Sequence, residues 1–268
     1  MVLLTQNIWT SLKSKMIDFV YVFRFDNDVL DQALNRLECS IRSLLKQTGQ
    51  QARIIVANYS KTDIGSWAEQ PCIEHYHIPM KDKEPFCKSK MINIAVKKYV
   101  RSKYFFLSDI DIVYTDNYIE SMLSVATLAK KTYKREVRVI PYVHWLAEDY
   151  YSESPNELIF KKWFYNTWSP GNGLVCTKSF KTMEGFDESF KGWGYEDINF
   201  NNEISQSDMC IIVENIMTFH LYHPFRKGIY EEVANTREIF QKKLDRTDEE
   251  ILKNWRIIKK EVKDTSKF

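Results

Sequence analysis

The sequence predicts an α/β fold, with helices covering a mostly parallel central sheet in a single domain. Three short apolar runs typical of buried strands, residues 19–23, 53–57 and 104–107, are separated by segments with helical periodicity. Each run is followed at once by polar residues. Strand, helix and strand with short returns form a right-handed βαβ unit, so these strands should lie parallel. Their polar ends then meet at one edge, where ligands of open α/β sheets bind.

The first βαβ unit begins with the strand at 19–23, which leads into a polar loop at Arg24. Apolar residues then recur at helical spacing until Gly49, a residue typical of a helix end. They are Leu30, Leu34, Leu37, Ile41 and Leu45. The second strand, 53–57, is followed by a polar loop that begins at Asn58.

The second unit has a helix around residues 91–99 and a strand at 104–107, which ends at Asp109. Because Arg24, Asn58 and Asp109 each follow a strand, their loops should converge on one crevice. Beyond this point the pattern is less regular, and residues 142–168 are aromatic without a clear period. Further strands are predicted at 137–140, 173–176 and 210–213.

The C-terminal segment predicts an amphipathic helix. Thr247 and Glu250 form a capping-box pattern that opens it. Its apolar stripe consists of Ile251, Leu252, Trp255, Ile258 and Val262. Lysines and arginines flank this stripe, so the helix either packs on the protein or lies on an anionic membrane surface. We therefore divide the chain into a domain at 1–246, with halves at about 17–115 and 116–246, and a helix at 247–268.

Composition narrows the class of protein. The chain has 268 residues, of which 44% are hydrophobic and 28% charged, and its net charge of +2 is spread along the sequence. A nucleic-acid partner is not expected, because such proteins cluster their basic residues. The sequence contains no apolar run long enough to cross a membrane and no signal-peptide pattern. Its five cysteines are scattered and form no CxxC motif. These features predict reduced thiols and a cytoplasmic protein, at most peripheral to the inner face of the membrane.

Asp109 and Asp111 are the sharpest chemical signal. Two carboxylates one residue apart, just beyond a buried strand, repel each other unless a cation lies between them. A divalent ion such as Mg²⁺ or Mn²⁺ binds carboxylate oxygens and bridges them to phosphates. A pair of solvent-facing loop acids is the simpler alternative. His220 and His223 are candidate further ligands, since imidazole suits Mn²⁺ better than Mg²⁺.

The segment from Gly192 to Asp197, Gly-Trp-Gly-Tyr-Glu-Asp, is the second strong signal. Flanking glycines let the backbone turn tightly and present the indole of Trp193, whose flat face suits a sugar ring. Glu196 and Asp197 can hydrogen-bond hydroxyls and accept a proton from one of them. The alternative is a turn with a buried Trp and an acid pair at a helix N-terminus. Lys88 and Arg24 could neutralise a diphosphate beside the crevice.

Together these pieces resemble the GT-A glycosyltransferases, most closely the β-1,4-galactosyltransferase type and related bacterial capsule enzymes. Four blocks, in that family's order within residues 19–225, carry the likeness. They are Val22-Phe23-Arg24, the run from Pro85 to Ile94, Ser108-Asp109-Ile110-Asp111, and Gly185-Phe186-Asp187 with the run from Gly192 to Asp197. The chain departs from the family at Lys88, where the family has arginine, and at Asn58, where many relatives have aspartate.

The resemblance implies a role for each matching residue. Asp111 would bind Mn²⁺ (or Mg²⁺) directly, with Asp109 holding the donor ribose or a metal-bound water. The pair His220 and His223 would supply the remaining protein ligands. The other roles follow the same matches: Arg24, Asn58 and Lys88 on the donor nucleotide, Trp193 and Glu196 on the acceptor sugar, Asp197 as general base, and Trp168 beside the donor's C2 group.

The implied reaction moves galactose or an N-acetylhexosamine from a UDP-sugar to a glycan or lipid-linked glycan. The Glu-Asp pair favours inversion and a β-linkage, and a bacterial or viral enzyme of surface polysaccharide synthesis fits the chain. Two alternatives stay open. One is a retaining enzyme resembling the polypeptide N-acetylgalactosaminyltransferases, which usually have Glu-Asn instead of Glu-Asp. The other is a non-catalytic glycan-binding subunit of a synthesis complex. A phosphoryl-transfer enzyme is disfavoured, because no GxxxxGK[ST] loop occurs.

Overall fold

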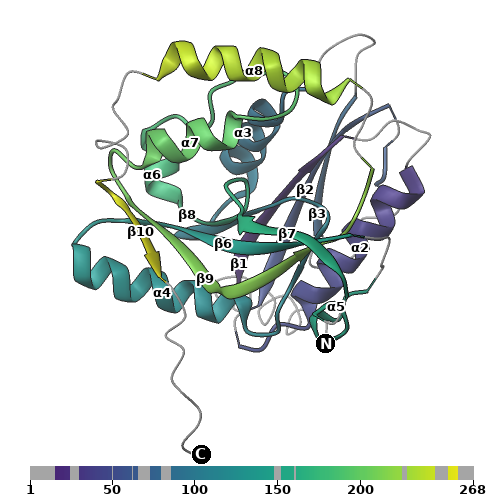
Figure 1. Cartoon of the computed structure of the whole chain (residues 1–268), viewed down its shortest axis with the longest axis horizontal. Coiled ribbons are helices and arrows are strands. Elements are labelled where there is room, and N and C mark those ends of the chain that lie inside the picture. The colour runs from purple at the N-terminus through teal and green to yellow at the C-terminus, as the bar shows by residue number, and fades with distance from the viewer. Residues whose placement is uncertain are drawn as a thin grey trace, which may run out of the picture.

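The computed structural model shows one mixed sheet with helices on both faces (Figure 1). It describes residues 16–24, 30–49, 51–61, 63–65, 73–79, 86–147, 152–159, 161–224, 228–244 and 253–258. In this part of the chain, strands follow the order β10-β9-β6-β8-β4-β1-β2-β3, with β5 paired to β9 and β7 to β6. The predicted α/β class is confirmed.

The N-terminal half of the sheet is parallel. Its strands are β1 (Ile17–Phe23), β2 (Ala52–Ser60), β3 (Ile73–Pro79) and β4 (Tyr104–Ser108). Tyr21 pairs with Ser108 and Phe23 with Asn58, so the carboxyl ends of β1, β2 and β4 lie side by side. Helices α2 (Leu30–Leu45) and α3 (Lys88–Tyr99) form where apolar periodicity predicted them. The first half of the fold therefore follows the predicted βαβ pattern, except that β3 is an edge strand that was not predicted.

The C-terminal half of the sheet is mixed. β8 runs antiparallel to β4 and β6, whereas β6, β9 and β10 are parallel to one another. The carboxyl ends of β6 and β9 consequently lie at the same edge as that of β4. The bounds are β5 (Ile112–Tyr114), β6 (Val137–Leu146), β7 (Trp163–Trp168), β8 (Gly173–Cys176), β9 (Met209–His220) and β10 (Trp255–Ile258).

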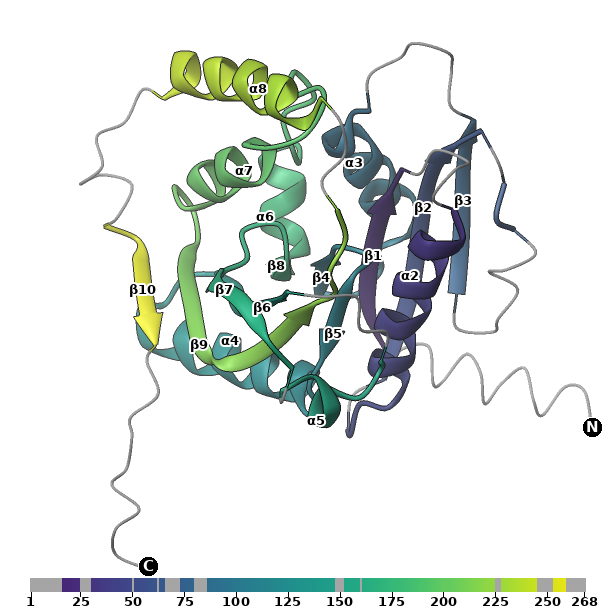
Figure 2. The same ribbon diagram turned by 45° about the vertical axis from the view of Figure 1, so that its right-hand side comes forward.

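The helices form two layers around the sheet (Figure 2). α2 and α4 cover one face, and their apolar residues join one buried cluster. α3, α6 and α7 cover the opposite face with a second cluster, and α8 lies outside α7. The remaining bounds are α4 (Tyr118–Tyr133), α5 (Pro155–Leu158), α6 (Thr177–Thr182), α7 (Glu196–Ile204) and α8 (Ile229–Lys243).

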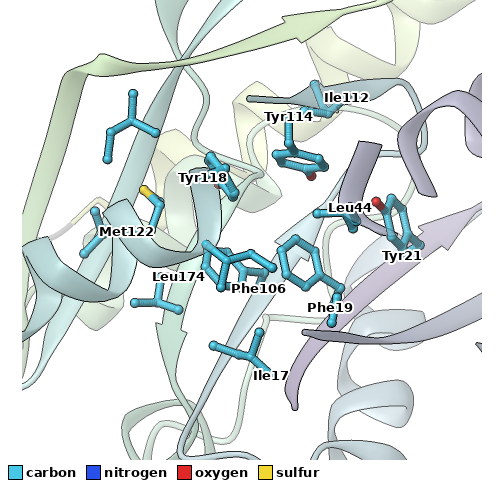
Figure 3. Packing of buried hydrophobic residues seen from close by; sticks show 14 of the residues in the cluster. Ile17, Phe19, Tyr21, Leu44, Phe106, Ile112, Tyr114, Tyr118, Met122 and Leu174 are labelled. Atoms are coloured by element: carbon cyan, nitrogen blue, oxygen red, sulfur yellow. The ribbon is translucent and has the colours of Figure 1, made fainter. Parts of the chain in front are cut away.

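Aromatic packing holds β1, β4 and α4 together in the first cluster (Figure 3). Phe106 is fully buried and stacks on Phe19, with ring centroids 4.4 Å apart. It also packs against Tyr118 of α4 at 5.4 Å. The same ring thus joins two neighbouring strands to the helix that covers them.

Truncating Phe106 should therefore be costly. We expect Phe106→Ala to lower the free energy of unfolding by about 3–5 kcal/mol, because it removes a buried ring and leaves a cavity. Urea denaturation measures the change. Leu128→Ala, at a residue 65% exposed, is the control and should change it by less than about 0.5 kcal/mol. Equal losses in the two variants would contradict this account of the core.

Two predicted boundaries are corrected. Asn58 lies inside β2, not in the following loop, and its buried side chain accepts a hydrogen bond from the Ser60 hydroxyl. The polar residues at 58–60 continue the strand because β3 pairs with all three of them, and β1 pairs with Asn58. The strand predicted at 210–213 continues to His220, since β6 offers a parallel partner over most of this length.

The prediction of a C-terminal helix is wrong for residues 255–258, which form β10 and pair with β9. Trp255 pairs with Cys210, and the preceding Asn254 is held by Arg135 (Nη1 to Oδ1, 2.7 Å). A short apolar run fits a strand or a helix equally well, and here the open edge of β9 supplies backbone partners. The predicted capping box at 247–250 and residues 259–268 lie outside the described residues. Without a helix at 255–258, the apolar stripe that suggested membrane contact is broken.

None of the helices described is long and apolar enough to cross a bilayer. Four of the cysteines lie in the described ranges, and all four are free thiols: Cys39, Cys87, Cys176 and Cys210.

Candidate active site

The site forms at the carboxyl edge of the sheet. Asp109 follows β4, Arg24 follows β1, and Lys88 is the first residue of α3. His220 ends β9, which runs parallel to β4 through the intervening strands. The predicted convergence of these loops follows from this strand order.

Asp111, His220 and His223 form a cluster of three ligand atoms within 4.8 Å of one another. The antiparallel pairing of β5 with β9 sets Ile112 opposite His220, and Leu221 donates its N–H to the Asp111 carbonyl (2.8 Å). The Nε2 atoms of His220 and His223 lie 3.4 and 3.2 Å from Oδ1 and Oδ2 of Asp111. The two histidines are brought together by the end of β9 and the segment directly after it, not by a helical turn.

The electrostatics of this cluster suit a divalent cation. Burial opposes ionisation of Asp111, but the two histidines hold its pKa well below the ordinary value. Burial lowers the pKa of His220, which favours the neutral imidazole that binds metals. Burial acts the same way on His223, but its hydrogen bond with Asp111 outweighs this and raises its pKa. Asp111 Oδ1 is buried without a hydrogen-bond partner among the described residues, so the residues fit a cation.

Trp145 supports the cluster from β6 and was missed by the sequence reasoning. It pairs in register with His220, and the two rings stack with centroids 3.7 Å apart and planes inclined by 19°. On its other side, the pairing of β6 with β7 has a register shift between Trp145 and Leu146. Such irregularities are frequent beside active sites, where they re-aim a side chain. The aromatic density of residues 142–168 was the only signal in the sequence.

A second charged cluster lies around Lys88. Its Nζ donates to Asp109 Oδ1 at 2.6 Å and lies 3.9 Å from Glu196 Oε1. Burial opposes the ammonium charge, but Asp109 and Glu196 raise the pKa of Lys88 above its ordinary value. One cation thus joins the aspartate after β4 to the first residue of α7. The structure brings these predicted residues together.

Glu196 and Asp197 differ in exposure and in hydrogen bonding. Glu196 is buried, and its Oε2 has no hydrogen-bond partner in the described part of the chain. Burial, reinforced by Asp197, raises the pKa of Glu196 to about 7, although Lys88 counteracts it. Asp197 is half-buried, and burial raises its pKa as well. Asp197 is therefore the more accessible of the two carboxylates.

The glycines beside Trp193 form the tight turn that the sequence predicted. Gly192 and Gly194 adopt φ angles of +99° and +98°, a region that favours glycine. Gly192 donates its N–H to the Phe86 carbonyl (2.7 Å), which anchors this loop to the start of α3. Trp193 is 48% exposed, so it is not the buried turn residue of the simpler alternative. Glu196 and Asp197 begin α7, so the alternative of an acid pair at a helix N-terminus is also correct.

Three other predicted residues lie outside the two charged clusters described above. Arg24 is half-buried immediately after β1, and Asn58 is buried in β2. Trp168 packs edge-on against Trp255 of β10, with centroids 5.5 Å apart. That contact ties Trp168 to the C-terminal strand. No sequence pattern indicated this contact, because the partner segment was predicted as a helix.

Comparison with known proteins gives consistent results. Residues 156–226 match the family model described as the N-terminal domain of galactosyltransferase. Chondroitin sulfate N-acetylgalactosaminyltransferase 2 from Mus musculus is 24% identical to this chain over 171 residues, which cover 61% of this chain and 31% of that protein. The Homo sapiens protein is 25% identical over 151 residues, covering 53% and 28%. The chain thus spans less than a third of these relatives.

A solved structure of GalNAc-T7 with UDP, GalNAc and Mn²⁺ superposes with a TM-score of 0.58 at 13% identity. The superposition covers 90% of this chain and 48% of the other. The chain has the GT-A fold. The predicted resemblance to galactosyltransferase-like GT-A proteins is confirmed by the family match and this fold.

Proposed function

We propose that the chain is a metal-dependent glycosyltransferase that moves a hexose from a UDP-sugar to a hydroxyl of a glycan, with inversion. The observation that carries this proposal is the grouping of three features at one sheet edge. They are a carboxylate-histidine cluster, a lysine shared between two acids, and an exposed Trp beside a Glu-Asp pair. The similarity to glycosyltransferases in sequence and fold supports it.

The metal ligands in this proposal are Asp111, His220 and His223. One carboxylate and two imidazoles suit Mn²⁺ better than Mg²⁺, which prefers oxygen ligands. The bound ion would supply positive charge to the donor diphosphate. Trp145 fixes the plane of His220 by stacking, and the β5–β9 ladder fixes the position of Asp111.

On the donor side we assign Lys88, Asp109, Arg24 and Asn58. The ammonium of Lys88 lies between Asp109 and Glu196 and would offset phosphate charge as a point cation. Asp109 is held by Lys88, which leaves its partly exposed carboxylate in a fixed orientation toward a ribose hydroxyl or a metal-bound water. The buried Asn58, which pairs with Phe23 inside β2, and Arg24, which follows Phe23, complete this edge.

On the acceptor side, Trp193 would stack on a sugar ring, Glu196 would hold a hydroxyl, and Asp197 would remove its proton. Asp197 is the accessible carboxylate, and its raised pKa makes it a better base than an exposed aspartate. A base that activates the acceptor for direct attack gives a single displacement. An α-linked donor sugar then yields a β-linked product.

The pKa values predict the pH dependence of transfer. Both acids have raised pKa values, and that of Glu196 is about 7, so the pair gains a proton as the pH falls through neutrality. We expect kcat/KM, measured at saturating Mn²⁺, to decline below about pH 7. In Glu196→Gln the remaining decline reports Asp197 alone and should move to lower pH. An acidic limb that stays in place in this variant would contradict the assignment.

Nucleotide release tests the function directly. The full chain is incubated with Mn²⁺, a panel of UDP-sugars, and glycan or lipid-linked glycan acceptors, and UDP release is measured with and without acceptor. We expect acceptor-dependent release with one donor class, and NMR of the product should show a β-linkage. An α-linkage would support the retaining alternative. Glycan binding without release from any donor would support the binding subunit instead.

A further inference from the structure

Arg138 of β6 is a fully buried cation with no carboxylate among its hydrogen-bond partners. A guanidinium has five N–H donors. Arg138 makes five hydrogen bonds, of 2.7–3.2 Å, and their acceptors are the carbonyls of Val139, Pro170, Asn172 and Leu174 and the side-chain oxygen of Asn201. Burial lowers the pKa of Arg138 to about 10, so it still carries its charge at neutral pH.

Two of the partners of Arg138, Pro170 and Asn172, lie in the segment 169–173, here called the hub loop. Gly171 lies between the two halves of the candidate site. A Cβ atom added there would be 3.4 Å from Asp197 Oδ2, 3.5 Å from Asp109 Oδ2 and 3.6 Å from Lys88 Nζ. The backbone of the hub loop therefore passes next to the donor-side and acceptor-side carboxylates at once.

Asn172 connects the hub loop to the donor side. Its side chain is buried and contacts Asp109 twice: Oδ1 accepts the Asp109 N–H (2.7 Å), and Nδ2 donates to Asp109 Oδ2 (2.9 Å). Nδ2 also donates to the Ser169 hydroxyl (2.6 Å). Arg138 holds the same residue through its carbonyl. Asp109 is thus fixed by Asn172 on one oxygen and by Lys88 on the other.

Asn201 connects the hub loop to the acceptor side. It lies one helical turn after Asp197 in α7, and its Nδ2 donates to the carbonyls of Asp197 (2.7 Å) and Pro170 (2.8 Å). Its Oδ1 accepts from Arg138 Nε (3.0 Å). Asn201 is fully buried, so these contacts are shielded from water. The first turn of α7, with Asp197, is therefore tied to the same loop as Asp109.

We propose that Arg138, Asn172 and Asn201 form a positioning network that sets the donor carboxylate Asp109 and the base Asp197 at a fixed separation. The inference rests on the roles proposed above for these two acids. The network has two separable arms: Asn172 orients Asp109 toward the donor, and Asn201 orients Asp197 toward the acceptor. Arg138 joins the arms, because its fork contacts the hub loop and Asn201 together.

The two arms predict different kinetic effects. Asn172→Ala should raise the donor KM about tenfold while kcat changes less than about threefold, because a hydrogen bond to a charged group is lost. Asn201→Ala should lower kcat about tenfold with the donor KM within about twofold. Arg138→Met should show both effects, and adding Asn172→Ala to it should raise the donor KM little further. Kinetics are measured well below the Tm of each variant.

A purely structural role would lower the Tm of each variant but leave KM and kcat per folded molecule unchanged. Asn117→Ala, at an exposed asparagine whose side chain makes no cap hydrogen bond, is the matched control and should leave all three quantities unchanged. If Arg138→Met does not fold, the two asparagine variants, which keep the arginine, decide the question. Wild-type KM and kcat in both of them would overturn the inference.

Calorimetric titration with UDP and Mn²⁺ separates this inference from the proposed function. Asn172→Ala should weaken UDP binding about tenfold, whereas Asn201→Ala should bind UDP like the wild type. A wild type that binds UDP but transfers no sugar would overturn the proposed function, and the affinity ratio would still test the Asn172 arm. Equal UDP affinity in Asn172→Ala and the wild type would contradict that arm.

Discussion

Replacing Asp111 with alanine is expected to abolish sugar transfer. The variant removes the only carboxylate of the cluster with His220 and His223, and two imidazoles alone would bind Mn²⁺ weakly at a diphosphate site. Acceptor-dependent UDP release at saturating donor is the measurement. EDTA should silence the wild type in the same way, and added Mn²⁺ should restore it.

Controls separate metal loss from misfolding. Asp116→Ala changes an exposed acid five residues further along the chain and should keep wild-type activity. Circular dichroism should show that Asp111→Ala remains folded. Of the two histidines, we expect His220→Ala to be the more damaging, because His220 is buried and stacked on Trp145 whereas His223 is partly exposed. Full activity of the wild type in EDTA would refute the metal assignment.

The candidate site could be predicted largely because its residues follow strand ends. In a parallel sheet, the positions after successive strands converge, so Arg24 and Asp109 were expected at one edge, and the structure places them directly after β1 and β4. The Gly-Trp-Gly-Tyr-Glu-Asp segment could also be predicted, because two glycines on either side of a Trp indicate a tight turn with a presented ring. The pairing of Asp111 with His220 needed the family resemblance, because more than one hundred residues separate them.

What the sequence did not predict depends on contacts between distant segments. Arg138 looks like an ordinary charged residue in a strand, and only the folded chain shows that its donors contact the hub loop, the backbone of β6 and β8, and Asn201. Asn201 likewise has no local signal, and Trp145 is indicated only by the aromatic density of residues 142–168. At 255–258 the apolar pattern was read with the wrong period, because the edge of β9 that pairs with it is over forty residues away. Polar networks and edge pairing are tertiary properties.

Replacing Asp197 with asparagine is expected to lower kcat by about a hundredfold or more, because the shape is kept and the proton acceptor is lost. The reason for choosing Asp197 over Glu196 is its exposure. Asp197 is half-buried and lies beside the hub loop at Gly171, whereas Glu196 is buried and faces Lys88. Initial rates at saturating donor and acceptor measure the loss, and UDP affinity should stay within about twofold of the wild type.

Glu203→Gln is the matched control, because it neutralises an exposed acid on the same helix and should be silent. Glu196→Gln is expected to raise the acceptor KM more than it lowers kcat, since Glu196 is proposed to hold a hydroxyl. If Asp197→Asn turned over normally and Glu196→Gln lost activity, the base would be Glu196. Its raised pKa would then place its proton uptake near neutral pH, and the acidic limb of the wild-type profile would belong to that residue. The two variants together therefore assign the proton to one carboxylate or the other.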